Sequence, residues 1–534
     1  MPIIVAAFAA TAFAAPAAAQ NGYSFVDAAK SPLNFSQATV KPQMACRELR
    51  GMTDGNVSIL SAETMAAADG VPEHCRVSGV IAPEIRFEVN LPAAWNRRFY
   101  MNGNGGFAGE SPDFPPRAAL RANALRHGFV SATTNTGHDA AQEPLASFAL
   151  GNPQKVIDYA FRAVHLTATT AKRLAARYYG RPVAYSYWDG CSTGGRQGLI
   201  EAQRFPADFD GIIAGAPVLN FVDTMVVALW NAKALDAAPI SLEKLKVVAD
   251  AVYAKCDAAD GLADGVIDDP RRCDFDPARD LPKCAAGQDA ASCVTEAQAG
   301  ALKKIYEGVI SDGKPYFPGQ PIGAEKIGIP LFPPPQPLSG WDLWLVGRGG
   351  GLFGGKSLQL AYGESFMRHM AFQKADPSYD WKSFDFDKDP ARLAEIRRLL
   401  NAADPDLTLF RKRGGKLLMY FGWADTALTP FMAIDYYEKA VAANGPDTTD
   451  FVRLFMVPGM FHCRGGFGTD RLDAMTALIN WVENGAAPQS IPAARVEQGQ
   501  VKRTRPLGPY PQVARYNGSG SIDDAANFTC KESR

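Results

Sequence analysis

The sequence predicts an α/β fold in which one globular domain carries a large insertion. A strand, a glycine-rich tight turn and a helix follow one another over residues 185–205, and another apolar strand ends at 217. Two late apolar strands, at 416–421 and 455–457, are followed by turns with polar residues. Between these groups, residues 218–415 contain helical patches and no strand-building pattern. This order indicates a sheet interrupted by an inserted segment.

The composition is that of a folded protein without a strong electrostatic character. The 534 residues are 47% hydrophobic, 10% aromatic and 21% charged, which excludes a disordered or fibrous chain. Lys and Arg number 55 against 56 Asp and Glu, so the net charge is −1. Such a chain lacks the basic surface that attracts nucleic acids or anionic membranes. We therefore expect a small-molecule partner, with no nucleic acid and no membrane.

Residues 1–19 are predicted to be a secretory signal peptide. They are apolar and small, and they end in three alanines before Gln20, a pattern that signal peptidase accepts. A disordered Ala-rich tail is the alternative. No other stretch reaches the ~18 apolar residues that a membrane span requires. The mature protein is therefore expected to be secreted or periplasmic.

Ser192 is the predicted nucleophile. It lies in Gly190-Cys-Ser-Thr-Gly194, between a predicted strand and a predicted helix. A Gly-x-Ser-x-Gly match in this context is typical of the nucleophile elbow, where glycines permit a sharp turn that exposes the serine hydroxyl. The predicted fold class is therefore an α/β-hydrolase with a large inserted lid domain. We assign residues 20–217 and 416–534 to the hydrolase domain and 218–415 to the lid.

The base and the acid are expected to follow the serine in the order Ser, Asp, His. His462 comes after the apolar strand at 455–457 and a Pro-Gly turn, where the catalytic histidine of this fold belongs. Asp425 stands just after the strand at 416–421. Asp404 and Asp435 are weaker candidates for the acid, and His369 falls in a predicted helix.

An oxyanion hole needs two backbone N–H groups aimed at one point. Thr193, directly after the serine, is expected to supply the first. A glycine loop at 102–106 follows a predicted strand at 97–101, and Gly105 or Gly106 is expected to supply the second. A plain glycine turn is the alternative for either residue.

Nine cysteines in an exported protein favour disulfides, and the odd number leaves one unpaired. Spacing suggests three local pairs but does not prove them. These are Cys46 with Cys75, Cys256 with Cys273, and Cys284 with Cys293.

A fourth pair, Cys191 and Cys463, is suggested by position. Cys191 precedes the serine and Cys463 follows the histidine, so a contact between serine and histidine would bring both near the disulfide range, a Cα separation of about 4.4–6.8 Å. Two buried free thiols are the alternative.

These motifs resemble the tannase and feruloyl esterase family, which includes the hydrolase of mono(2-hydroxyethyl) terephthalate. The resemblance rests on Gly-Cys-Ser-Thr-Gly-Gly, Gly-Trp-Ala-Asp and the His-Cys pair, and it runs from about Cys46 to Cys530. It implies hydrolysis of aromatic esters by a triad of Ser192, Asp425 and His462. It also implies a disulfide between the triad-adjacent cysteines and a lid domain that carries calcium.

The lid contains an acidic loop at 257–268. Carboxylates and glycines around a bend suit Ca²⁺, although a solvated acidic loop has the same composition. The resemblance implies a structural calcium ion in a loop closed by a Cys256–Cys273 bridge. The implied ligands are carboxylates of Asp257, Asp260 and Asp264 and backbone carbonyls of Leu262 and Val266.

Substrate contacts are expected within residues 341–372. Trp341, Trp344 and Phe366 are candidates for a flat apolar slot, and Arg368 for the cation that meets an aromatic acid. Packing in the lid core is the alternative for these aromatic residues. The family pattern has a cysteine where this chain has Gly508, so Cys530 is expected to be unpaired.

The expected function is that of a serine carboxylesterase that acts on esters of aromatic acids through an acyl-enzyme. The alternative is a non-catalytic aromatic- or carbohydrate-binding protein on the same scaffold, which the intact triad residues argue against. The acid, the alcohol and the oligomeric state stay open.

Overall fold

The computed structural model describes residues 24–328, 340–347 and 355–533. Among these residues, nine strands form one sheet in the order β1-β2-β3-β5-β4-β6-β7-β10-β11. Their bounds are Val57–Met65 (β1), His74–Ile81 (β2), Ile85–Pro92 (β3), Arg98–Asn102 (β4), Val130–Thr134 (β5), Tyr185–Cys191 (β6), Gly211–Gly215 (β7), Lys416–Gly422 (β10) and Val452–Val457 (β11). The late strands at 416–421 and 455–457 are confirmed, the second of them extended toward the N-terminus.

The sheet has an antiparallel edge and a parallel centre. Strands β1, β2, β3 and β5 pair antiparallel, whereas β5, β4, β6, β7, β10 and β11 run parallel. The carboxyl ends of the parallel strands therefore meet at one edge, where open α/β sheets place their ligands.

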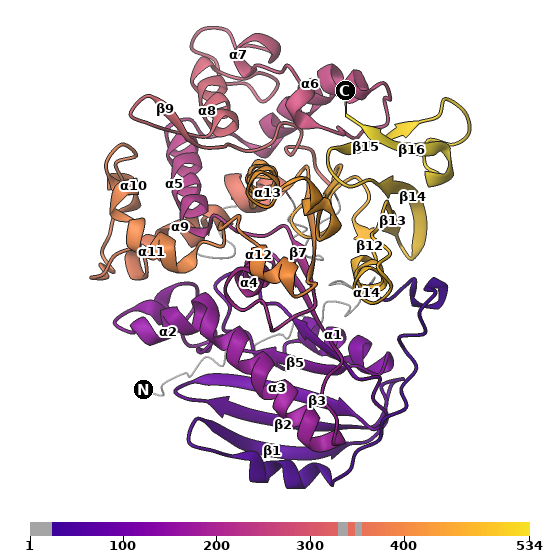
Figure 1. The fold of residues 1–534 in the computed structure, drawn as a ribbon. Helices are drawn as coiled ribbons and strands as arrows, with labels where there is room; N and C mark the ends of the chain where they lie inside the picture. The colour runs from indigo at the N-terminus through magenta and orange to yellow at the C-terminus, as the bar shows by residue number, and fades with distance from the viewer. Residues whose placement is uncertain (1–23, 329–339, 348–354, 534) are drawn as a thin grey trace, which may run out of the picture.

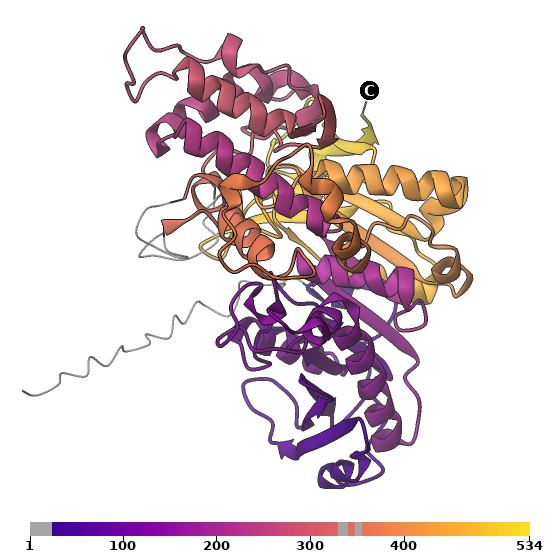
Figure 2. The same ribbon diagram turned by 90° about the vertical axis from the view of Figure 1, so that its left-hand side faces the viewer.

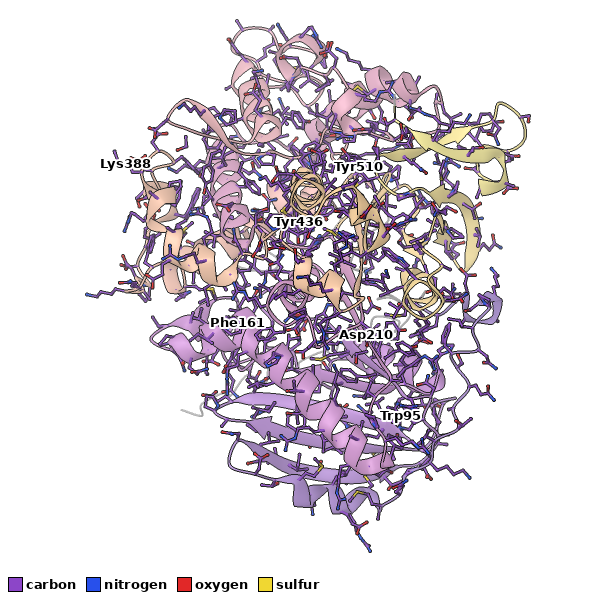
Figure 3. The ribbon with its side chains drawn as sticks, viewed as in Figure 1. Trp95, Phe161, Asp210, Lys388, Tyr436 and Tyr510 are labelled. Atoms are coloured by element: carbon purple, nitrogen blue, oxygen red, sulfur yellow. A yellow bond between two sulfur atoms is a disulfide. The ribbon has the colours of Figure 1, made fainter. Side chains whose placement is uncertain are left out.

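Helices cover both faces of this sheet. On one face lie α1 (Pro115–Arg126) and α14 (Ala474–Asn484), whose residues Ala124 and Leu478 belong to one apolar cluster. On the other face lie α3 (Ala163–Tyr179), α4 (Thr193–Arg204) and α13 (Phe431–Asn444). Trp95 stacks on Tyr179 of α3 with ring centroids 4.5 Å apart (Figure 3). The parallel strands are thus almost entirely buried between helices, whereas the edge strand β1 is partly exposed.

The insertion lies between β7 and β10, which are neighbours in the sheet. Its helices are α5 (Phe221–Ala237), α6 (Leu242–Cys256), α7 (Pro277–Asp280), α8 (Glu296–Glu307), α9 (Leu358–His369), α10 (Asp389–Arg392), α11 (Ala394–Leu400) and α12 (Thr408–Lys412). Helices α6, α7 and α8 lie at the top of Figure 1, opposite strands β1–β3, while α10 and α11 lie at the left at mid-height and α12 lies near the centre; Figure 2 shows the same molecule turned by 90°. A two-stranded hairpin of β8 (Val309–Ser311) and β9 (Lys314–Phe317) is a short exception to the expected absence of strands.

The C-terminal segment returns to the insertion. It forms two small sheets from β12 (Arg471–Leu472), β13 (Ile491–Glu497), β14 (Gln500–Leu507), β15 (Gln512–Tyr516) and β16 (Phe528–Glu532). Between them the Tyr510 hydroxyl donates to Glu438 of α13 at 2.8 Å and accepts from Arg271 of the insertion at 3.1 Å (Figure 3). The C-terminal segment therefore links the hydrolase domain to the insertion.

Two of the three local cysteine pairs lie away from the acidic loop, and both are disulfides. Cys46 is bonded to Cys75 of β2 with their Cα atoms 5.4 Å apart, and both side chains are buried. Cys284 is bonded to Cys293 with a Cα separation of 5.0 Å, and this bridge closes a short loop of the insertion. These two of the three pairs that the spacing suggests are therefore confirmed.

The other two expected disulfides, Cys191 with Cys463 and Cys256 with Cys273, are also present. Cys530 is free within the described residues, as expected. The predicted signal peptide, residues 1–19, lies outside those residues. None of the described helices is long and apolar enough to cross a membrane.

Candidate active site

Ser192 sits on the sharp turn between β6 and α4. Its backbone has φ 63° and ψ −123°, a conformation that residues with a side chain rarely adopt. The turn is held by hydrogen bonds from Ser192 N to Gly215 O and from Arg196 N to Ser192 O, both 3.0 Å. A Cβ on Gly190 would lie 2.3 Å from the carbonyl oxygen of Gly194, so only glycine fits there. This is the predicted nucleophile elbow.

Asp425 and His462 stand on the turns after the neighbouring strands β10 and β11. Asp425 Oδ2 lies 2.7 Å from His462 Nδ1, and the carboxylate is fully buried. The other carboxylate oxygen accepts from the N–H groups of Ala427 and Leu428 at 2.9 and 3.0 Å, which fixes its orientation. The histidine is 9% exposed.

The rival acids lie elsewhere. Asp435 pairs with Lys439 on the exposed side of α13, and Asp404 is an exposed loop residue. Neither carboxylate is hydrogen-bonded to a histidine in the part of the chain that the structure describes. Of the three candidate acids, only Asp425 is hydrogen-bonded to a histidine within the described residues.

A disulfide fastens the histidine loop to the elbow. Cys191 and Cys463 form a disulfide with their Cα atoms 6.0 Å apart, within the range expected for a disulfide. Ser192 and His462 line the same cavity. The bridge therefore fixes the backbones beside both residues.

The oxyanion loop follows β4 and approaches the elbow closely. A Cβ on Gly103 would lie 2.5 Å from the Cα of Gly194, and the Thr193 hydroxyl donates to Gly106 O. The Gly105 N–H is directed at Glu110 Oε1, 3.2 Å away, and is not available to a substrate. Of the two expected glycines, Gly106 therefore fits better, because within the described residues its N–H meets no acceptor.

A cavity of about 580 Å³ opens above the serine. Its catalytic end is polar, and the remainder is lined by aromatic and aliphatic side chains from both the hydrolase domain and the insertion. These include Phe107, Phe114, Leu120, Phe221, Met225, Trp344, Leu358 and Tyr362. An apolar cavity with few polar groups is typical of a small-molecule site.

Only one of the four expected substrate contacts lies in this cavity. Trp344 lines it and meets the His462 ring edge-on, with centroids 5.5 Å apart. Trp341 is 1% exposed in the insertion core, and Phe366 is fully buried against Phe221. Arg368 pairs with Glu364 at 2.9 Å. None of these three lines the cavity within the described residues, so the geometry does not support their assignment to the substrate.

Several lining residues are not predicted from the sequence. Tyr362 stands on α9 and stacks on Trp344 at 6.3 Å, while Phe107 follows the oxyanion glycines. Arg464, two residues after His462, also lines the cavity. Its proximity to the histidine in sequence is the signal that would have found it.

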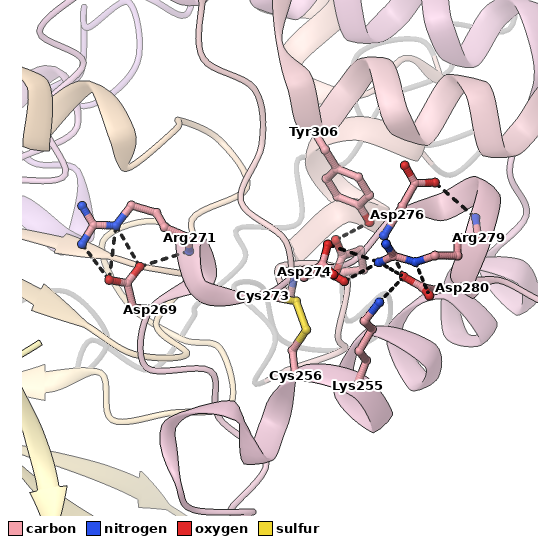
Figure 4. Close-up of a disulfide and its surroundings, with 12 residues drawn as sticks. Lys255, Cys256, Asp269, Arg271, Cys273, Asp274, Asp276, Arg279, Asp280 and Tyr306 are labelled. Carbon is pink, nitrogen blue, oxygen red and sulfur yellow. Dashed lines mark hydrogen bonds and ion pairs between the residues drawn. A yellow bond between two sulfur atoms is a disulfide. The ribbon is translucent and has the colours of Figure 1, made fainter. Parts of the chain in front are cut away.

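The acidic loop of the insertion is closed by the Cys256–Cys273 disulfide (Figure 4). Beside that bridge, Asp269 pairs with Arg271 and Asp280 with Lys255, both at 2.6 Å. These ion pairs balance the charges of the two aspartates that lie beside the loop.

Within the loop, three carboxylates accept backbone N–H groups of the loop itself: Asp257 from Gly265, Asp260 from Leu262 and Asp264 from Val266. Asp264 also pairs with Arg505. Among the described residues, the oxygen atoms of these three carboxylates do not all lie within 4.8 Å of one another. Burial, with Asp260 and Asp264 nearby, raises the pKa of Asp268 to about 8.

The parallel sheet, the elbow and the Asp–His pair at the carboxyl edge define an α/β-hydrolase. A family model for tannase and feruloyl esterase matches residues 70–531. An uncharacterized esterase of Xanthomonas campestris pv. campestris is 36% identical, with 93% of this chain and 92% of that protein covered.

Two further proteins are similar over most of their length. The mono(2-hydroxyethyl) terephthalate hydrolase of Piscinibacter sakaiensis is 35% identical, with 88% of this chain and 87% of that protein covered. The crystal structure of feruloyl esterase B from Aspergillus oryzae has a TM-score of 0.77 at 26% identity and covers 91% of this chain and 99% of that one. The chain belongs to the tannase and feruloyl esterase family and is a carboxylic ester hydrolase.

Proposed function

We propose that this esterase hydrolyses esters of aromatic acids through an acyl-enzyme on Ser192. The observation that carries the proposal is the buried Asp425–His462 hydrogen bond in the cavity that also exposes the elbow serine. The aromatic lining and the related terephthalate and feruloyl esterases support an aromatic acyl group.

The proposal gives each group one role. Asp425 holds Nδ1 of His462, which leaves Nε2 to take the proton as the Ser192 oxygen attacks the ester carbonyl. The N–H groups of Thr193 and Gly106 stabilise the oxyanion. His462 returns the proton to the departing alcohol, and then activates a water that attacks the acyl-enzyme and releases the acid.

Turnover of p-nitrophenyl acetate by the chain and by Ser192→Ala tests the mechanism. The variant should lose at least about 10³-fold in kcat while melting at the same temperature. Unchanged hydrolysis would exclude Ser192 as the nucleophile. Methyl gallate, methyl ferulate and a terephthalate monoester would then rank the acyl groups.

We also propose that the loop at 257–268 binds a structural calcium ion. Hard oxygen donors on a tight loop are what Ca²⁺ prefers, and the set comprises the carboxylates of Asp257, Asp260 and Asp264 with the carbonyls of Leu262 and Val266. Bound calcium would reduce the repulsion between these carboxylates and support residues 218–415 as a lid.

Chelation tests this metal proposal. Binding to the folded state stabilises it by about 2.7 kcal/mol at a hundredfold excess over Kd, so chelation should lower the melting temperature and added Ca²⁺ should restore it. Asp260→Ala should abolish the response, whereas hydrolysis of p-nitrophenyl acetate should persist. A melting temperature that changes with neither chelator nor added calcium would contradict the proposal.

Export is proposed on the same terms. The four disulfides of the described residues fit an oxidising compartment. Cell fractionation and N-terminal sequencing of the mature protein should find it outside the cytoplasm and beginning at Gln20; a cytoplasmic protein that retains residues 1–19 would contradict this.

A further inference from the structure

Arg464 is a cation of the cavity whose role is not explained by the catalytic residues. It follows Cys463 in the histidine loop, is partly buried and lines the cavity with Ser192. Within the described residues, no carboxylate oxygen lies within 4.0 Å of its guanidinium, and no acceptor is hydrogen-bonded to it. Burial and the neighbouring Arg471 lower its pKa, so its surroundings disfavour the charge it carries.

A second arginine of the cavity provides the contrast. Arg117 pairs with Glu110 and donates to Gly103 O, so its charge is balanced within the protein. The carboxylate whose charge acts on Arg464 is that of Asp470, which accepts from Gly465 N at 2.9 Å and faces Arg471. Arg464 therefore lines the cavity without a carboxylate paired to it within the described residues.

Such a group is costly to bury unless an anion meets it. A guanidinium presents a planar fork of N–H donors that matches the two oxygens of a carboxylate. Two carboxylates also line the cavity, Glu110 and Asp189, but they accept hydrogen bonds from Asn104 and Tyr100, and neither is paired with Arg464 within the described residues.

We propose that Arg464 binds a carboxylate of the substrate, so that the enzyme prefers aromatic esters bearing a free carboxylate. The inference rests on the proposed function and adds its substrate class. The carboxylate is carried either by the acid part or by the alcohol part of the ester. The two sources share one chemistry and are separated by the choice of probe.

Two matched pairs of esters test the proposal. For the acid part, monomethyl terephthalate is compared with methyl 4-carbamoylbenzoate; for the alcohol part, carboxymethyl benzoate is compared with carbamoylmethyl benzoate. Each pair replaces a carboxylate by a neutral amide of the same size. In at least one pair, the charged ester should have the higher kcat/KM.

The variant Arg464→Met should lower kcat/KM for the preferred charged ester about 10- to 100-fold and leave its amide partner within about twofold. Arg464→Lys should recover part of the loss, because it keeps the charge without the fork. Arg368→Met is the matched control, since Arg368 is paired with Glu364 outside the cavity. Equal losses for both esters, no loss for either, or a charge preference removed by Arg368→Met would overturn the proposal.

Binding to Ser192→Ala separates this inference from the mechanism. Calorimetry on that variant should find the charged ester bound more tightly than the amide, and the difference should vanish when Arg464→Met is combined with Ser192→Ala. If Ser192→Ala still hydrolyses esters, the nucleophile assignment fails. If Ser192→Ala is inactive but binds both esters equally, the Arg464 proposal alone fails.

Discussion

The two ends of the cavity are built in different ways. At the catalytic end, Ser192, Asp425 and His462 each follow a strand of the parallel sheet, so the sheet sets their positions. At the other end, Trp344 and Tyr362 stand on short helical segments of the insertion, where packing between helices decides their direction. The sheet therefore positions the three proposed catalytic residues, whereas the aromatic lining of the cavity depends on how the insertion packs.

The two ends are also fastened differently. The Cys191–Cys463 bond holds the catalytic end covalently. The insertion meets that end through Gln359 of α9, whose amide donates to the carbonyl oxygens of Thr426 and Ala427 at 3.0 and 3.2 Å. Changes at the catalytic end should consequently alter kcat, and changes in the insertion should alter KM.

The largest effect is expected from Asp425→Asn. The amide cannot hold His462 in the required tautomer or stabilise its positive form, so kcat should fall about 10³- to 10⁴-fold. The matched control Asp435→Asn, on exposed α13, should stay within twofold. Steady-state kinetics with p-nitrophenyl acetate measures both, and a deep loss with Asp435→Asn would reassign the acid.

A smaller loss is expected when the covalent link is removed. With Cys191→Ala and Cys463→Ala combined, kcat/KM should fall about 10- to 100-fold, because small displacements of the serine and histidine backbones are costly. The control combines Cys284→Ala and Cys293→Ala, which removes a disulfide of the insertion and should leave kcat/KM within about twofold. Full activity in the first double variant would show that the sheet alone suffices to hold the triad.

At the insertion end, Trp344→Ala should raise KM for an aromatic ester about 5- to 10-fold with little change in kcat for a small activated ester, since one aromatic wall is lost. Trp341→Phe, outside the cavity, should leave KM unchanged. If Trp344→Ala lowered kcat and left KM unchanged, the expectation that the insertion end acts on KM would be wrong.

The smallest effect on activity is expected from Gly508→Cys. A Cβ at this position would lie 3.0 Å from the Cβ of Cys530, although the Gln512 side chain, with its Cβ 2.8 Å away, must shift. We expect a disulfide that stabilises by up to ~3 kcal/mol in the chain-entropy model, with unchanged kcat/KM. Thiol titration and melting curves, with Gly508→Ser for comparison, check this; two free thiols after oxidation would refute it.

The contrast explains what the sequence could predict. The elbow, the Asp–His pair and the four disulfides follow from local motifs on strands and short loops, because a strand end, a glycine turn and the alternation of the sheet leave few placements. Even the long-range Cys191–Cys463 bridge could be inferred, since both cysteines adjoin residues that must meet.

The rest depended on contacts between distant segments. The Gly105 N–H is hydrogen-bonded to Glu110, a partner that no sequence pattern indicates. Trp341 and Trp344 are separated by a single turn, yet one enters the core and the other the cavity. Which face of a short helix looks inward is decided by the helices packed against it, and the sequence alone does not contain that information.

The central claim, that Ser192 is the nucleophile, is tested most directly by covalent labelling. A fluorophosphonate ester should modify one serine per chain, in the peptide that contains Ser192, and abolish hydrolysis of p-nitrophenyl acetate in step with labelling. Prior occupation of the cavity by a slow aromatic ester should delay the reaction. Modification of another residue with loss of activity, or full hydrolysis by a chain whose Ser192 is labelled, would contradict the account.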